Sequence, residues 1–250
     1  MITVGNGILS VELLDPNAAH GRLGARYCHG GYIWQIKDGM GRPMLSGPHY
    51  PDPDPAPFDG QGMPEAFKTP ELAQPCIWDI GRGDDYAVMT ARQDSIKLRR
   101  EVRVCGNKVE SVTTVDNISG NDVKIRWFSH PFFPLNDDLA CGKINAPVSV
   151  PENAGYAFGD DGMVRMKPDY PWQKGLFQPL EVPREKLIFT VPHPVAGSVE
   201  LSTDYDVAYC PVWANKNTFS FEPFMERVVG PGEAVSWGVA VRFLHENASV

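Results

Sequence analysis

Apolar and polar residues alternate along much of the chain with a period of two, which predicts β-strands. The clearest case is 234–243, where apolar residues occupy every second position from Val235 to Phe243. The other segments that we expect to form strands are 8–14, 97–117, 123–130, 186–191, 198–202 and 218–224. The 24 Gly and 23 Pro residues punctuate these segments, and hardly any helical pattern is found. The expected fold class is therefore all-β, as a large antiparallel β-sandwich.

A β-hairpin is predicted over 97–117. Leu98, Val102 and Val104 share one face of its first strand, and charged residues share the other. The pair Gly106-Asn107 separates the two halves and is typical of a tight turn. The basic run at 97–103 is broken by a glutamate, and we interpret it as the solvated face of this hairpin.

Composition limits the classes of function. The 250 residues suit one domain, 1–250, and neither an internal repeat nor a linker divides them. A formal net charge of -8 argues against binding to nucleic acid or to an anionic membrane surface. No apolar run reaches the roughly 20 residues that span a bilayer, and the N-terminus lacks the pattern of a signal peptide, so a cytoplasmic location is expected. Five scattered cysteines without a CxxC pair predict reduced thiols rather than disulfides or a zinc site.

The stretch WFSHPFFP ends a predicted strand with a histidine. In 123–130 the apolar residues, Trp127 among them, fall on one face and are expected in the core. The other face carries Arg126, Phe128 and His130. His130 is therefore expected on the more polar face, directly before a proline.

A second strand, 218–224, ends in the same way. Phe219 and Phe221 share one face, while Glu222 lies on the other face together with polar residues and is followed by a proline. Two short strands thus each end in a titratable residue plus proline, one an imidazole and the other a carboxylate.

With these residues the chain resembles the galactose mutarotase-like (aldose 1-epimerase) superfamily. HPFFP at 130–134 is similar to the HPYF-type signature of that superfamily, and FEPF at 221–224 to a short Glu-Pro element near the C-terminus of many members. RYCHGGYIWQI at 26–36 resembles an early strand, and GPGEAVSWGVAVRF at 230–243 a closing strand. The resemblance covers most of the chain, although each motif is short.

The resemblance implies a β-supersandwich that binds a monosaccharide or sugar derivative and acts on it with His130 and Glu222. Interconversion of α and β anomers needs a base that removes the anomeric hydroxyl proton and an acid that protonates the ring oxygen. A carboxylate suits the first role and a histidine the second, because imidazole titrates near neutral pH. The hypothesis is a cofactor-independent aldose 1-epimerase with Glu222 as base and His130 as acid; the chemistry requires no metal.

Further residues are candidates for contacts with the sugar. His29 lies in the only HGG sequence, much earlier than the corresponding histidine of standard members, and strict alternation would place Arg26 on the opposite face. Glu65 lies in the proline-rich segment 47–75, which could form a rim over the site. Phe132 and Trp213 could wall the site or stack on the sugar, although a core position is the commoner role for a tryptophan.

Two classes of function remain open at this point. The first is the epimerase, which needs His130 and Glu222 on opposite sides of one sugar-sized gap. The second is a carbohydrate-binding or regulatory protein that has the same fold without turnover. Neither the identity of the sugar nor the formation of a homodimer follows from the sequence.

Overall fold

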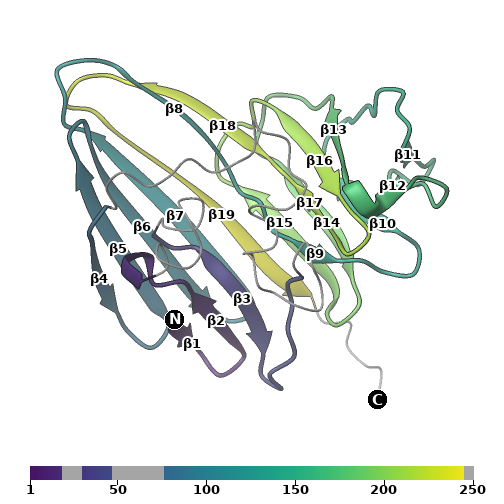
Figure 1. Ribbon diagram of the computed structural model, residues 1–250, viewed down its shortest axis with the longest axis horizontal. Coiled ribbons are helices and arrows are strands. Elements are labelled where there is room, and N and C mark those ends of the chain that lie inside the picture. The colour runs from purple at the N-terminus through teal and green to yellow at the C-terminus, as the bar shows by residue number, and fades with distance from the viewer. Residues whose placement is uncertain (19–29, 47–75, 245–250) are drawn as a thin grey trace. The chain divides into compact units, whose positions relative to one another are not determined.

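The computed structural model describes residues 1–18, 30–46 and 76–244. Within these ranges the regular secondary structure is almost entirely β-strand, and the strands pair in antiparallel sheets (Figure 1). The all-β class with large antiparallel sheets is therefore confirmed. The chain divides into two compact units.

Of the described residues, unit 1 comprises 1–18, 30–43, 76–123 and 228–237. Its complete strands are β1 (Ile2–Gly5), β2 (Leu9–Leu13), β3 (Ile33–Asp38), β4 (Trp78–Arg82), β5 (Tyr86–Gln93), β6 (Ile96–Cys105) and β7 (Lys108–Asn117). Strands β1, β2 and β3 form one sheet, and the other sheet has the order β19-β7-β6-β5-β4. Only the first residues of β19 (Ala234–Leu244) belong to this unit.

The predicted hairpin is confirmed as β6 and β7. Ile96 pairs with Asn117 at its open end and Cys105 with Lys108 at the turn, where Gly106 has a φ of +58° that favours glycine. On the charged face, Glu101 lies 2.5 Å from the Arg99 guanidinium and 3.0 Å from that of Arg103. Glu101 thus offsets part of the positive charge on this face of the hairpin.

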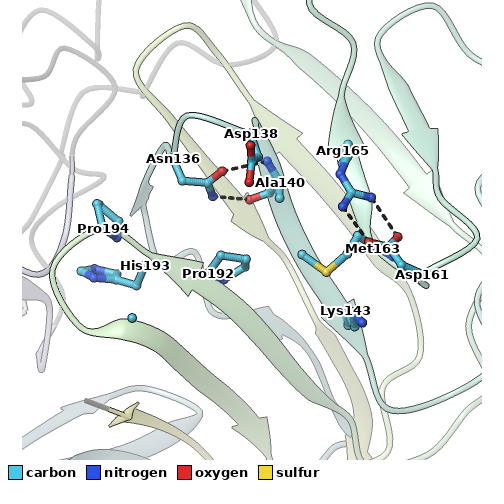
Figure 2. Close-up of a pocket in the computed structure, with 11 residues that line it drawn as sticks. Asn136, Asp138, Ala140, Lys143, Asp161, Met163, Arg165, Pro192, His193 and Pro194 are labelled. Atoms are coloured by element: carbon cyan, nitrogen blue, oxygen red, sulfur yellow. Dashed lines mark hydrogen bonds and ion pairs between the residues drawn. The ribbon is translucent and has the colours of Figure 1, made fainter. Parts of the chain in front are cut away.

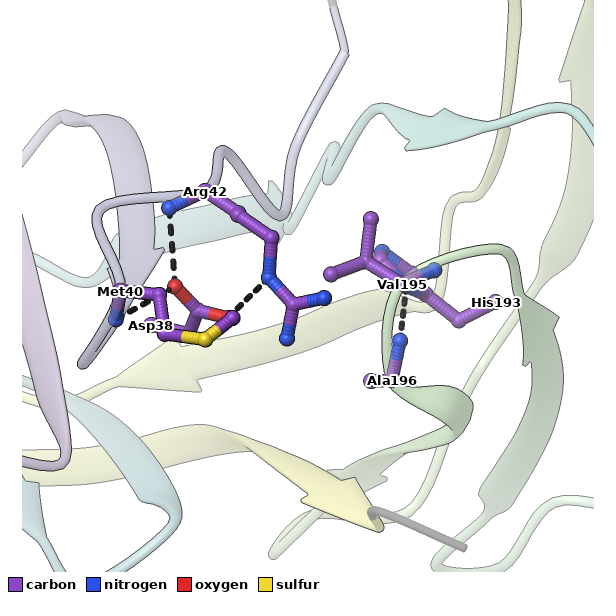
Figure 3. Close-up of polar contacts among 6 residues, drawn as sticks. All are labelled: Asp38, Met40, Arg42, His193, Val195 and Ala196. Atoms are coloured by element: carbon purple, nitrogen blue, oxygen red, sulfur yellow. Dashed lines mark hydrogen bonds and ion pairs between the residues drawn. The ribbon is translucent and has the colours of Figure 1, made fainter. Parts of the chain in front are cut away.

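A tight turn after β3 is organised by one carboxylate. The Asp38 oxygens accept hydrogen bonds from the backbone N–H groups of Met40 and Arg42 and from the Arg42 side chain, at 2.6 to 3.0 Å (Figure 3). Burial raises the pKa of Asp38, but the hydrogen bonds from Arg42 and Met40 outweigh burial and leave that pKa below its usual value.

Of the described residues, unit 2 comprises 44–46, 124–227 and 238–244. Its strands are β8 (Val123–Phe128), β9 (Phe133–Pro134), β10 (Ala140–Ile144), β11 (Tyr156–Phe158), β12 (Val164–Met166), β13 (Leu176–Leu180), β14 (Ile188–His193), β15 (Gly197–Thr203), β16 (Cys210–Ala214), β17 (Thr218–Phe221) and β18 (Phe224–Val229), with the greater part of β19. Within the unit, one sheet has the order β11-β12-β10-β14-β15-β19, a second β13-β16-β17-β9, and β8 pairs with β18.

The predicted strand 218–224 is divided in the structure. β17 ends at Phe221 and β18 begins at Phe224, with Glu222 and Pro223 between them. Proline has no N–H to donate to a neighbouring strand, which favours a break in the ladder at this point. Glu222 therefore occupies a short link between two strands.

Candidate active site

Antiparallel pairing of β9 with β17 brings the two motifs together. Phe133 pairs with Phe219, and the next residue of β9 pairs with Thr218. When this register is continued along both chains, His130 falls directly opposite Glu222. We call 126–134 the histidine segment and 218–226 the glutamate segment.

Side-chain contacts follow the same register beyond the paired strands. Phe128 stacks on Phe224 with ring centroids 4.3 Å apart, and Arg126 lies 3.2 Å from Glu226. The pairs His130–Glu222, Phe128–Phe224 and Arg126–Glu226 thus follow one another at intervals of two residues along both segments. The two segments thus run antiparallel in a single register over nine residues each.

His130 and Glu222 are in direct contact. The His130 Nε2 atom lies 3.4 Å from Glu222 Oε1. The Glu222 side chain is 6% exposed and that of His130 is 21% exposed, so the carboxylate is covered and the imidazole is the more accessible partner. The sequence led us to expect a gap between these two groups; instead they lie side by side, because the register of β9 with β17, continued beyond the ends of both strands, places them directly opposite each other.

Two more strands extend this surface. Trp213 of β16 pairs with Ser220, and Tyr209 forms a β-bridge with Phe224, while Phe177 of β13 pairs with Trp213. Directly opposed residues share a face of a sheet, as do alternate residues along a strand. We call this the site face, and its members are Arg126, Phe128, His130, Phe132, Phe177, Pro179, Tyr209, Pro211, Trp213, Ser220, Glu222, Phe224 and Glu226.

The alternate residues of the same strands face the core. Phe133, Phe219, Phe221 and Val212 are all 0% exposed. The Trp127 ring contacts buried Tyr205 edge-on. His130 lies beyond the end of β8, on the side that the sequence assigned to it, whereas Trp127, which was expected in the core, is only half-buried.

The polar residues of β17 do not face solvent, however. Thr218 and Ser220 are 0% exposed, and their hydroxyls donate to the backbone carbonyl oxygens of Phe133 and Phe221. The inference of a polar face at 218–224 was wrong in this respect. Large aromatic side chains from the neighbouring strands cover both faces of β17, and alternation within one strand cannot reveal such a cover.

Aromatic rings surround His130. Its ring centroid lies 4.4 Å from that of Phe132, 5.8 Å from that of Phe128 and 5.9 Å from that of Trp213, which it meets edge-on. Four of the candidate residues from the sequence, His130, Glu222, Phe132 and Trp213, thus lie together. Arg26, His29 and Glu65 lie outside the described residues.

The charge of Glu222 acts on its neighbours. Burial raises the pKa of the Cys210 thiol, and Glu222 raises it further. Burial also raises the pKa of Tyr209, where Glu222 adds to the effect and Arg126 opposes it. Both side chains remain protonated at neutral pH, so Tyr209 is a hydrogen-bond donor and Cys210 is not a nucleophile.

Sequence reasoning missed Phe177 and Tyr209. Phe177 belongs to the proline-containing strand LFQPL, and Tyr209 directly precedes the proline-containing strand CPVWA, so regular alternation is hard to recognise at both. The CPVWA segment did carry one signal, because Trp213 was itself a candidate. A residue two or four positions from a candidate on the same strand shares its face.

The other histidine of the described residues has a structural role. His193 is 3% exposed, and its Nδ1 accepts hydrogen bonds from the backbone N–H groups of Val195 and Ala196 (Figure 3). Its Nε2 lies 2.8 Å from the Met44 carbonyl oxygen, to which it donates in the corresponding tautomer. Both ring nitrogens are engaged in holding the β14–β15 turn.

A cavity of about 440 Å³ lies beside this turn and is separate from the His130–Glu222 pair. Figure 2 shows its Arg165 guanidinium joined to Asp161 by two hydrogen bonds, at 2.8 and 2.7 Å. These bonds hold the pKa of Asp161 well below its usual range. The two charges satisfy each other, and the cavity offers no acid–base pair comparable to His130 and Glu222. No group of three His, Cys, Asp or Glu side chains that could hold a metal ion occurs in the described ranges.

Comparison of the chain with known proteins yields structural likeness alone. No protein-family model matches the sequence, and no curated protein matches it either. Among solved structures, a galactose mutarotase related enzyme from Lactobacillus acidophilus superposes with a TM-score of 0.64 at 14% identity, over 99% of this chain and 98% of that one. A candidate aldose 1-epimerase from Escherichia coli K12 gives 0.62 at 12% identity, over 96% and 97%. A galactose mutarotase-like protein from Lactobacillus casei gives 0.54 at 13% identity, over 97% and 99%.

The molecule is thus an all-β protein of large antiparallel sheets that presents a His–Glu pair on one sheet face. Its fold is that of the galactose mutarotase-like proteins, as the sequence motifs indicated. In the described part of the chain, no helix has the length and apolar character needed to cross a membrane.

Proposed function

We propose that this protein is a cofactor-independent aldose 1-epimerase, which interconverts the α and β anomers of a sugar or sugar derivative. The observation that carries the proposal is the contact between His130 Nε2 and Glu222 Oε1 on a face lined with aromatic rings. The likeness to solved structures that bear mutarotase and aldose 1-epimerase names adds support.

In the proposed reaction Glu222 takes the proton of the anomeric hydroxyl while protonated His130 gives a proton to the ring oxygen. The bond between the anomeric carbon and the ring oxygen then breaks, and an open-chain aldehyde forms. Rotation of the aldehyde group and ring closure reverse the two proton transfers and regenerate both residues. Proton transfer by positioned groups of this kind contributes about 10²- to 10⁴-fold in rate.

The separation of the pair suits this chemistry. The anomeric oxygen and the ring oxygen are bonded to the same carbon, so they lie closer together than the two ends of a hydrogen bond. An acid and a base 3.4 Å apart can therefore each reach one of the two oxygens from the same side of the sugar. The aromatic rings beside His130 offer apolar surface to the C–H groups of the ring.

The test is NMR exchange spectroscopy between anomers, with D-glucose, D-galactose, D-mannose and their phosphates as substrates. We expect the wild-type protein to accelerate exchange of at least one sugar, and Glu222→Gln and His130→Asn to lose at least a hundredfold of that acceleration. Glu185→Gln, which alters an exposed glutamate of the same unit away from the site face, is the matched control and should behave as wild type. Full exchange activity in both site variants would refute the proposal.

A second candidate function is a carbohydrate-binding protein without turnover. The observation that favours it is the missing gap: His130 and Glu222 contact each other, and a sugar would have to reach a carboxylate whose side chain is only 6% exposed. Sugar binding without any acceleration of anomer exchange would select this function over the enzyme.

A further inference from the structure

Tyr209 and Phe177 extend the site face beyond the His130–Glu222 pair. Tyr209 forms its β-bridge with Phe224, which is two residues from Glu222 along the glutamate segment. A strand rises about 3.3 Å per residue, so Phe224, and with it Tyr209, lies about 7 Å from Glu222 along the sheet. That spacing is comparable to the width of a single sugar ring.

Short side chains separate the Tyr209 ring from its neighbours on the same face. Pro211 lies between Tyr209 and Trp213 on β16, and Pro179 lies opposite Pro211 on β13. Above them the rings of Tyr209 and Phe177 approach to 6.5 Å between centroids. Phe177 is 46% exposed, a large apolar area for a residue on a sheet face.

The Tyr209 hydroxyl is available to a ligand. In the ranges that the structure describes, this hydroxyl makes no hydrogen bond to another protein group. The phenol lies within electrostatic reach of both Arg126 and Glu222, which places it at the same site. Burial keeps the phenol protonated, so it can donate to an oxygen of a bound molecule.

We propose that Tyr209 is a substrate-binding residue that donates a hydrogen bond to one hydroxyl of the sugar, remote from the anomeric carbon, while Phe177 packs on the ring's apolar C–H groups. This inference rests on the proposed function, because the sugar is the one that His130 and Glu222 open. Tyr209 thereby contributes to the choice among sugars that differ in a single hydroxyl.

The first test separates binding from chemistry. The affinity of Glu222→Gln protein for the sugars of the panel is measured by calorimetry, with and without Tyr209→Phe in addition. Loss of one neutral hydrogen bond should weaken binding about fivefold. Tyr170→Phe is the matched control, because Tyr170 is also half-buried but packs against Trp172 and is not part of the site face.

The second test identifies the hydroxyl. We expect the fivefold effect of Tyr209→Phe to disappear with one monodeoxy form of the best sugar and to persist with the other deoxy forms. In anomer exchange the same variant should raise KM with little change in kcat, since the contact is equal in ground state and transition state. Phe177→Ala should weaken binding about tenfold, whereas Phe158→Ala, at a phenylalanine that is 45% exposed on β11, should not.

The outcomes distinguish the two proposals. Sugar binding that is unchanged by Tyr209→Phe would overturn the role of Tyr209 and leave the epimerase proposal intact. A Tyr209→Phe penalty that is equal for every deoxy form would also overturn it, since no hydroxyl is then recognised. Wild-type protein that neither binds nor interconverts any sugar of the panel would overturn the proposed function and this inference together.

Discussion

The contact between His130 and Glu222 predicts that their contributions to catalysis are not additive. The perturbation is a double-mutant cycle of wild type, His130→Asn, Glu222→Gln and the double variant. Each single change should lower kcat/KM for anomer exchange by about 10²- to 10⁴-fold, the range of a lost general acid or base. At 1.36 kcal/mol per factor of ten, that corresponds to about 3 to 5 kcal/mol of transition-state stabilisation.

The structure sets the size of the coupling. In the proposed reaction both groups act on oxygens of one carbon, and in the structure their nearest atoms are 3.4 Å apart. If one of the two proton transfers cannot proceed, the residue that performs the other no longer accelerates the reaction. The double variant should therefore be about as slow as the slower single variant. The coupling energy should then approach the smaller single effect, about 3 kcal/mol or more.

The assay is NMR anomer exchange with the best sugar of the panel, with the thermal unfolding midpoint of each variant as a check on folding. Losses that multiply in the double variant would show that the two residues act independently. That result would refute a shared step and the geometry on which it rests. A single variant that retains full activity would refute the role of that residue.

Three further predictions concern stability, each measured by urea unfolding. The guanidinium of Arg99 lowers the pKa of Glu101, burial opposes this, and a second arginine lowers it further. The ion pairs of Glu101 therefore stabilise the fold at a pH above the unfolded-state pKa near 4.5, and this stabilisation is lost as the pH falls through the lower folded-state pKa. Glu101→Gln should lower the free energy of unfolding by about 0.5 to 1 kcal/mol at pH 7 and leave it unchanged in acid. A loss of stability that does not depend on pH would contradict this. Gly142→Ala should cost about 1 to 3 kcal/mol, because φ is +144° and the new Cβ would lie 2.6 Å from a backbone oxygen, whereas Gly120→Ala in open space should be nearly neutral. Phe133→Ala, at 0% exposure, should cost about 3 to 5 kcal/mol, and a cost below 1 kcal/mol would show that Phe133 is not a core residue.

The strands that sequence patterns predicted well are those with uninterrupted alternation. The hairpin of β6 and β7 and the long strand β19 were found with nearly correct bounds, because period-two burial and a Gly-Asn turn act within neighbouring residues. The orientation of His130 on its strand was predictable for the same reason. The fold class followed from these local signals together with the short family-like motifs.

The contact between His130 and Glu222 could not be derived from local patterns. It depends on the pairing of β9 with β17, which joins segments 85 residues apart, as the hydrogen bond from Thr218 to the Phe133 carbonyl shows. The cover over β17 likewise comes from distant strands. Prolines in β13 and β16 concealed Phe177 and Tyr209 by interrupting the alternation that would have drawn attention to them.

The burial pattern of β16 has a consequence for how this protein can evolve: Trp213 is half-buried, whereas its other four residues, Pro211 included, are buried. Cys210, Val212 and Ala214 are 0% exposed, whereas the ring of Trp213 lies on the site face with that of Tyr209. A deep mutational scan should therefore show abundance falling at the even positions and sugar selectivity changing at the odd aromatic ones. Under the proposed function, single substitutions at Trp213 or Tyr209 change sugar selectivity while the buried residues of the strand, and with them the core, stay unchanged.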